Sequence, residues 1–334
     1  MTPAHHREPP MTYDALDALP LYRYRIDATF DRALAIPSQQ RAALWRGAFG
    51  AVLRSLVCHD GALQCAQCSL LASCPYARVF APRIPAGRPL IARLNDPPRP
   101  FMLTDPRPDA DVLPPGVKLG IGLTVAGVVV DEVLHLLVTL RKMGEIGLGR
   151  YQVRFVAESM RALDASGLAV QEVWKRGSEG VCAHRAPLRA RDLMRPGDDQ
   201  ARRIRVRFVT PADIREKDAS DAAPRFGALI RRSRDRIGAL ATFFGHGSIA
   251  HDPRALGTLA DTVATVSAEV TASEVARHSS RTGQWHPIGG VVGTVVYEGE
   301  AIAQTMPWLR VAELVGVGKH ATFGNGRLVV DVLG

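Results

Sequence analysis

A glycine-rich, basic stretch near the end of the chain has the residue types that bind phosphate. It runs from 316 to 327 and combines glycines with basic and hydroxyl side chains: Gly316, Gly318, Lys319, His320, Thr322, Gly324, Gly326 and Arg327. Glycine allows main-chain N–H groups to approach an anion closely, and the basic side chains add positive charge. The stretch therefore predicts a phosphate-binding loop.

A second group of residues has the chemistry of a metal site. Four of the five cysteines fall between positions 58 and 74: Cys58, Cys65, Cys68 and Cys74. Four thiolates at such spacing can close a tetrahedral zinc site, and the alternatives are an iron–sulfur cluster or unpaired buried thiols. Four cysteine ligands leave no open coordination position, so we expect a structural zinc rather than a catalytic one.

The charge of the chain favours a polyanionic partner. Lys and Arg total 42 against 33 Asp and Glu, a net charge of +9, and the excess is mostly arginine, which suits bidentate phosphate recognition. High-GC codon usage is the alternative explanation. No apolar run is long enough for a membrane span, and the first eight residues have no apolar core of a secretory signal. We therefore expect a cytoplasmic protein with reduced cysteines and no membrane partner.

The elements that must position these residues occur in the same order twice. Residues 22–30 predict a half-buried strand, 38–57 a helix, 118–130 a strand and 133 onward a helix, followed by a Gly-x-Gly-Arg sequence at 147–150 and a further strand. Residues 203–208, 224–244, 308–315 and 328–330 repeat the pattern, with Gly-x-Gly-Arg at 324–327. This order predicts an α+β protein of tandem ferredoxin-like (RRM-like, βαββαβ) domains, with the cysteine cluster inserted in the first.

The domain limits follow from composition. We expect a flexible leader over 1–18, a first domain over 19–190 and a second over 200–334, with a charged boundary that contains two prolines near 185–200. The first domain holds the cysteine cluster at 58–74 and a proline-rich segment at 82–116, which we expect to be extended with little regular structure. The second holds the glycine-rich loop at 316–327.

Several short motifs occur in a recognisable order: Trp45-Arg46-Gly47-Ala48, Cys74-Pro75-Tyr76-Ala77, Asp96-Pro97-Pro98-Arg99-Pro100-Phe101, Leu140 to Arg150, Arg277-His278-Ser279-Ser280-Arg281 leading into Gly289 to Gly293, and the final loop. With these motifs the chain resembles the CRISPR-associated repeat-processing endoribonucleases of the RAMP superfamily, in the subgroup with an upstream cysteine cluster. The motifs span nearly the whole sequence.

The resemblance implies a function. CRISPR repeat RNA would bind across two ferredoxin-like domains and contact the C-terminal glycine-rich loop. A metal-independent cut, in which the 2′-hydroxyl attacks the adjacent phosphate, would turn precursor crRNA into guide RNA with a cyclic phosphate end. The enzyme could then stay in the effector complex with other CRISPR subunits. The alternative is a non-cleaving RAMP subunit that binds and caps crRNA.

That reaction needs a base, a proton donor and cations around the phosphate. Imidazole suits the first two roles because its pKa lies near neutrality. We rank His246 and His320 first as catalytic residues, with His251 and His278 behind them and phosphate contact without catalysis as the competing role. Relatives often place a histidine on the first helix, but residues 38–57 contain none.

The remaining site residues are basic or lie in the arginine-rich motif. Arg281 and Lys319 are the candidates for steadying the reacting phosphate, since a fixed cation stabilises the charge that develops there. For the RNA backbone we expect contacts from further residues: Arg231, Arg232, Arg277 and Ser279.

Overall fold

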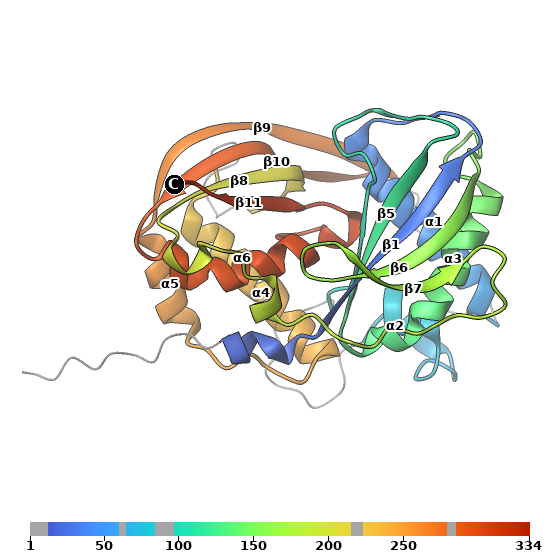
Figure 1. Ribbon diagram of the computed structural model, residues 1–334, viewed down its shortest axis with the longest axis horizontal. Coiled ribbons are helices and arrows are strands. Elements are labelled where there is room, and N and C mark those ends of the chain that lie inside the picture. Colours follow the sequence, from blue (N-terminus) through green and yellow to red (C-terminus); the bar gives the residue numbers. More distant parts are fainter. Residues whose placement is uncertain (1–12, 60–64, 84–96, 215–222, 279–284) are drawn as a thin grey trace, which may run out of the picture.

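The computed structural model describes residues 13–59, 65–83, 97–214, 223–278 and 285–334, and it contains two antiparallel sheets with helices against one face of each (Figure 1). The strands of the first sheet all lie between residues 21 and 175, and those of the second between 203 and 332. We refer to these as the first and second units. The predicted domain limits, 19–190 and 200–334, remain predictions.

The first unit has five strands in the order β3 (Phe101–Thr104), β5 (Lys118–Ala126), β1 (Leu21–Phe30), β6 (Phe155–Leu163) and β7 (Ala169–Lys175). Its helices are α1 (Ser38–Val57), α2 (Pro75–Phe80) and α3 (Val133–Ile146), and β2 (Leu34–Ala35) pairs with β4 (Val112–Leu113). Alternate residues of β1 turn to the helices, where Tyr24 and Ile26 are buried. Phe30 of β1 meets Trp45 of α1 edge-on at 6.2 Å.

The second unit has four strands in the order β11 (Leu328–Val332), β8 (Arg203–Ala212), β10 (Trp285–Glu298) and β9 (Ala264–His278). Its helices are α4 (Phe226–Phe244), α5 (Pro253–Asp261) and α6 (Ile302–Val315). Ile204, Val206 and Phe208 of β8 are buried against the helices, and Arg203, Arg205 and Arg207 alternate with them on the other face.

Chain order and sheet order together confirm the predicted tandem ferredoxin-like class. In the second unit the order β8, α4, β9, β10, α6, β11 is βαββαβ, and the fourth strand lies beside the first. The first unit repeats it as β1, α1, β3, β5, α3, β6, with β7 added at one edge of the sheet.

Some predicted boundaries differ from the structure. The strand expected over 118–130 ends at Ala126, because Gly127 has a φ of 62° and starts the short helix η4 (Gly127–Glu132). A Cβ at Gly127 would lie 1.8 Å from the Phe244 carbonyl oxygen, so this turn lets the two units approach closely. The strand expected after the Gly-x-Gly-Arg sequence at 147–150 begins at Phe155.

Two segments expected to be irregular contain structure. The proline-rich segment holds β3 and β4, while its residues 84–96 lie outside the described part of the chain. Of the expected leader, residues 1–12 also lie outside it, and Tyr13–Ala18 form the short helix η1, in which Leu16 is buried.

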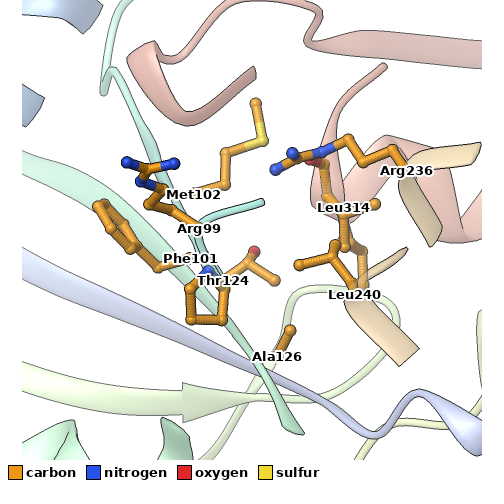
Figure 2. A pocket seen from close by; sticks show the side chains of 10 residues that line it. Arg99, Phe101, Met102, Thr124, Ala126, Arg236, Leu240 and Leu314 are labelled. Atoms are coloured by element: carbon orange, nitrogen blue, oxygen red, sulfur yellow. The ribbon is translucent and has the colours of Figure 1, made fainter. Parts of the chain in front are cut away.

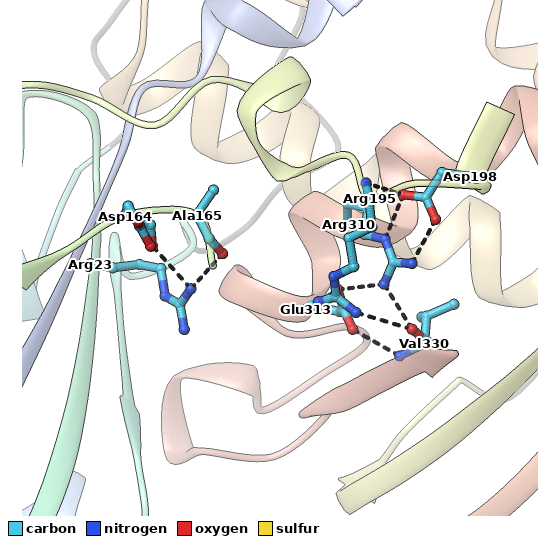
Figure 3. Close-up of polar contacts among 8 residues, drawn as sticks. All are labelled: Arg23, Asp164, Ala165, Arg195, Asp198, Arg310, Glu313 and Val330. Carbon is cyan, nitrogen blue, oxygen red and sulfur yellow. Dashed lines mark hydrogen bonds and ion pairs between the residues drawn. The ribbon is translucent and has the colours of Figure 1, made fainter. Parts of the chain in front are cut away.

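The segment before β8 is anchored by a buried ionic network (Figure 3). Arg310 of α6 donates two hydrogen bonds to the Asp198 carboxylate, at 2.9 and 2.7 Å, and one to the Val330 carbonyl, at 2.8 Å. Glu313 binds both Arg310 and Arg195. The expected boundary region is therefore attached to α6 and β11.

Within the described residues, no helix is both long enough and apolar enough to span a membrane.

Candidate functional site

The glycine-rich loop has a structural counterpart in the first unit. In each unit the last helix is followed by a glycine with a positive φ: Gly147 at 93° and Gly316 at 77°. The residue after this glycine is fully buried, and its backbone N–H closes the loop. Leu148 donates to the Val153 carbonyl at 2.8 Å, and Val317 donates to the Gly326 carbonyl at 2.9 Å. The second loop is longer, and the additional residues include Lys319 and His320.

The backbone of the longer loop is largely occupied by internal hydrogen bonds. Its N–H groups donate to protein acceptors at seven positions: Gly316, Val317, Lys319, Phe323, Gly324, Gly326 and Arg327. The predicted phosphate contacts of the glycines remain predictions. Lys319 is exposed and His320 is partly exposed with a left-handed φ of 63°, so side chains are the groups that the loop offers to a ligand. For Thr322 the structure describes the backbone, within η7 (Ala321–Phe323).

The loop packs on the first unit. A Cβ at Gly324 would lie 2.4 Å from the Ala42 Cβ of α1, which requires glycine there. The guanidinium of Arg46, also on α1, lies over the Phe323 ring at 4.3 Å, and the His320 and Phe323 ring centroids are 6.0 Å apart. The position of His320 is thus set by contacts between the two units.

The other leading histidine has different neighbours. His246 follows α4, is exposed, and donates its backbone N–H to the Ala18 carbonyl at 2.8 Å. His251 contacts the Ile249 carbonyl through Nδ1 at 3.0 Å, and its ring lies 5.0 Å from that of Trp308. Different elements therefore hold the histidines ranked highest from the sequence.

The first two residues of the arginine-rich motif, Arg277 and His278, are the last residues of β9. The backbones of Arg277 and His278 pair with β10 at the end of β9. Ser279 and Arg281 lie outside the described residues. Their predicted roles remain predictions.

The arginines of α4 already have partners within the chain. Arg231 binds both oxygens of Asp261 at 2.8 and 2.9 Å, and Arg232 lies 3.9 Å from Asp235. An RNA phosphate would have to compete with these carboxylates, so the predicted role of Arg231 and Arg232 gains no support from their surroundings.

The helix-free faces of both sheets carry arginines for which the sequence predicted no function. Arg23 and Arg25 alternate with the buried residues of β1, as the three arginines of β8 alternate with theirs. Asp27 is buried beside them and binds Arg25 at 2.8 Å and Arg161. The alternation of arginines with apolar residues over 22–30 and 203–208 indicates these basic faces in the sequence. From the sequence it was used only to predict strands.

Two of these arginines lie near Arg327 of the glycine-rich loop. Burial lowers the pKa of Arg327; Asp105 raises it in part, and the neighbouring charge of Arg207 lowers it again. Burial also lowers the pKa of Arg23, which Glu313 and Asp164 raise and which Arg195 and Arg327 lower. Nη1 of Arg327 is buried and has no hydrogen-bond partner among the residues that the structure describes. Three arginine side chains, Arg23 of the first unit and Arg207 and Arg327 of the second, therefore lie close together where the two units meet.

The cysteine cluster is only partly described. Cys58, Cys65, Cys68 and Cys74 are partly exposed thiols, with residues 60–64 outside the described part. In the described part, no group of three or more His, Cys, Asp or Glu side chains is placed to hold a metal ion. Cys58 is hydrogen-bonded to Arg54, whose pKa it raises. The zinc site expected from the four cysteines remains a prediction.

Comparison with known proteins agrees with this architecture. Residues 206–328 match the family described as CRISPR-associated endoribonuclease Cas6, and residues 19–186 match a family described as the AF_1859 N-terminal domain. Thermus thermophilus Cas6 is similar in fold, with a TM-score of 0.50 and 14% identity over 94% of this chain and 99% of that one.

A chain of a partial Cas6-RT-Cas1–Cas2 complex is also similar, with a TM-score of 0.54 and 14% identity over 94% of this chain and 46% of that one. No curated protein matches the sequence.

Proposed function

Because the chain belongs to the Cas6 family of CRISPR-associated endoribonucleases, we propose that it binds CRISPR repeat RNA and cleaves precursor crRNA into mature guide RNAs. The observation that carries this proposal is the gathering of Arg23, Arg207 and Arg327 where the two units meet. Nearby carboxylates, among them Asp109 at 3.8 Å from Arg207, offset part of this positive charge. RNA phosphates, which arginine binds bidentately, would compete with them for the rest.

In this proposal the RNA lies across the helix-free faces of both sheets. The arginines of β1 and β8 contact phosphates, and unpaired bases beside a hairpin are read by stacking and hydrogen bonding. Arg207→Gln is then expected to weaken RNA binding and to reduce the salt dependence by about one phosphate contact. Arg202→Gln is the matched control, since Arg202 is exposed and pairs with Glu300 at 2.8 Å.

Cleavage by attack of the 2′-hydroxyl needs proton transfer at two oxygens and a cation at the phosphate. His320 and His246 are the proposed proton carriers, and Lys319 and Arg281 the proposed cations. Each proton transfer contributes about 10²–10⁴ in rate. No metal ion takes part in this scheme, so the cut persists in EDTA and leaves a 2′,3′-cyclic phosphate.

The test uses purified protein and a repeat-containing transcript in EDTA. Discrete products with cyclic phosphate ends are expected, and a 2′-deoxy nucleotide at the cut should abolish cleavage while binding persists. A gel shift without products would overturn the nuclease. It would favour the non-cleaving RAMP subunit that caps crRNA, a candidate supported by the lack of histidine in α1.

Single replacements then test the site. His320→Ala and His246→Ala should each slow single-turnover cleavage with little change in RNA affinity, whereas Lys319→Ala should chiefly raise the Kd. If both histidine variants cut at the wild-type rate, the assignment of both residues is wrong.

Association with other CRISPR proteins is the last element of the proposal. The similar chain in the Cas6-RT-Cas1–Cas2 complex is support for such partners. Co-purification of the tagged protein with crRNA and other effector subunits would support retention, and recovery of the protein with crRNA alone would exclude it.

A further inference from the structure

The two units leave little unfilled space between them. A small pocket at their contact is lined by Thr124 of β5 and Leu240 of α4 among others, and it has room for about one water molecule (Figure 2). Arg236 in its wall donates to the Val315 carbonyl at 2.7 Å. A further protein partner of this chain is therefore expected on its outer surface rather than between the units.

The edges of the two sheets differ in length and in cover. β9 is the outermost strand of the second sheet, and its 15 residues make it longer than the other edge strands β3, β7 and β11, which have 4, 7 and 5 (Figure 1). Part of the β7 edge is covered, since the Cys182 N–H donates to the Val173 carbonyl at 2.8 Å. Within the described residues, the backbone of β9 from 264 to 272 bonds to no backbone other than that of β10.

This part of β9 is open to pairing with another strand. Every residue from Ala264 to Ala272 is exposed except Val270, which is partly exposed. A row of unpaired N–H and C=O groups is a template for a further strand, and many natural edges are protected by lysine or proline. Both residue types are absent from 264–276. The nine residues of 264–272, at about 3.3 Å per residue, give an available edge of about 30 Å.

The sequence of this edge is nearly the same when it is read in either direction. It runs Ala264-Thr265-Val266-Ser267-Ala268-Glu269-Val270-Thr271-Ala272. Two antiparallel copies related by a two-fold axis at Ala268 therefore place alanine opposite alanine, threonine opposite threonine and valine opposite valine. The remaining pair is Ser267 with Glu269, so no charges of the same sign lie directly opposite each other. Pairs of threonines and of β-branched residues stabilise antiparallel sheets.

We propose that β9 pairs with β9 of a second copy of this chain, antiparallel and centred on Ala268, so that the two four-stranded sheets become one continuous sheet. A second copy is the favoured partner because the near-palindrome makes the edge complementary to itself. A two-fold contact uses the same patch on both copies and closes as a dimer. The register of β9 against β10 shifts beside Val266, so the central pairs, Ala268 with itself and Ser267 with Glu269, lie in the regular part of the strand.

The oligomeric state of the full-length protein tests this pairing. Sedimentation velocity over a concentration series should show a reversible monomer–dimer equilibrium. Ser267→Lys should lower the dimer Kd and Ser267→Glu should raise it, each by about 2–30-fold, because two symmetric pairs with Glu269 become attractive in one variant and repulsive in the other. Ser267 is exposed in a single copy, so both variants should keep the wild-type Tm under dilute conditions. Ala169→Lys and Ala169→Glu, at an exposed position of the β7 edge, should leave the Kd unchanged.

Cysteine cross-linking tests the two-fold axis. The background is Cys182→Ser, which removes the exposed thiol outside the cysteine cluster. On oxidation by air, Ala268→Cys should form a disulfide-linked dimer, since in this pairing residue 268 lies opposite its own copy. Ala264→Cys would lie opposite Ala272 and should not cross-link. Equal cross-linking of the two variants would overturn the proposed pairing.

A single result would overturn the dimer itself. If the wild type and Ser267→Lys both sediment as monomers at every concentration, the proposal is wrong, and the edge is left to a strand of a different protein. None of these measurements involves RNA, so their outcome is independent of the nuclease proposal.

Discussion

The guanidinium carbon of Arg46 lies 4.3 Å from the centroid of the Phe323 ring. Arg46 belongs to α1 of the first unit and Phe323 to the glycine-rich loop of the second, so this cation–π contact joins the units beside His320. The guanidinium carbon of Arg46 also lies 5.3 Å from the centroid of the Phe80 ring.

Replacing Arg46 by methionine should destabilise the protein and slow cleavage. A partly desolvated cation–π contact is worth about 1–2 kcal/mol, and the loop that carries His320 loses one of its contacts with α1. Urea denaturation and single-turnover cleavage measure the two effects, and Arg46→Lys should restore part of both. Arg176→Met, at an exposed arginine, should stay within about 0.5 kcal/mol. Equal urea midpoints for Arg46→Met and wild type would contradict the prediction.

Two glycine replacements should have opposite effects. Gly324 has a φ of 79° and its added Cβ would meet Ala42 at 2.4 Å, so Gly324→Ala should lower the free energy of unfolding by about 1–3 kcal/mol. Gly47 lies mid-helix in α1 with nothing within 4 Å of its Cβ position, so Gly47→Ala should stabilise by up to about 1 kcal/mol. Thermal and urea unfolding of both variants should show that the free energy of unfolding falls for Gly324→Ala and rises for Gly47→Ala. Changes of the same sign in both variants would refute this prediction.

The Arg310–Asp198 pair should tolerate double replacement better than single replacement. Arg310→Met leaves the carboxylate of Asp198, 1% exposed, without its cation, at a cost of about 3–5 kcal/mol. Adding Asp198→Leu removes the stranded charge and should recover part of that loss. Urea unfolding of the two variants is the measurement, and a double variant less stable than the single one would disprove this account.

Stability should fall at alkaline pH. Tyr297 is fully buried and donates to the Pro224 carbonyl at 2.6 Å, and burial raises the pKa of its hydroxyl above the ordinary value of about 10. The folded state therefore keeps a proton that the unfolded chain releases. Its contribution is complete below about pH 10 and is lost as the pH rises toward the folded pKa.

Tyr297→Phe separates this effect from the fold itself. It should cost about 1 kcal/mol at pH 7, because a buried carbonyl loses its donor, and should make the decline above pH 10 shallower. The free energy of unfolding measured between pH 7 and 11 tests this. Parallel curves for variant and wild type would exclude Tyr297 as a source of the alkaline loss.

Metal content tests the cysteine cluster. If the four cysteines bind zinc, the purified protein should contain about one zinc per chain, and Cys65→Ser should lose it and be less stable. Elemental analysis is the measurement, with Cys182→Ser as the control outside the cluster. A metal-free wild type would end the zinc prediction.

Much of the fold could be predicted because its signals are local. The alternation of Tyr22, Tyr24 and Ile26 with arginines predicted β1, and Gly-x-Gly-Arg at 147–150 and 324–327 indicated the duplication. Strand ends such as Ala126 could not be predicted, because Gly127 turns the chain only where Phe244 of the second unit packs against it.

The sequence by itself determined the two βαββαβ units and the family motifs, since hydrophobic periodicity and glycine spacing act within a few residues. Only the tertiary structure decided that the Arg46 guanidinium lies over the Phe323 ring and that Asp261 pairs with Arg231. Such pairs are far apart in the chain, and their electrostatic energy depends on distance and burial, which packing alone sets.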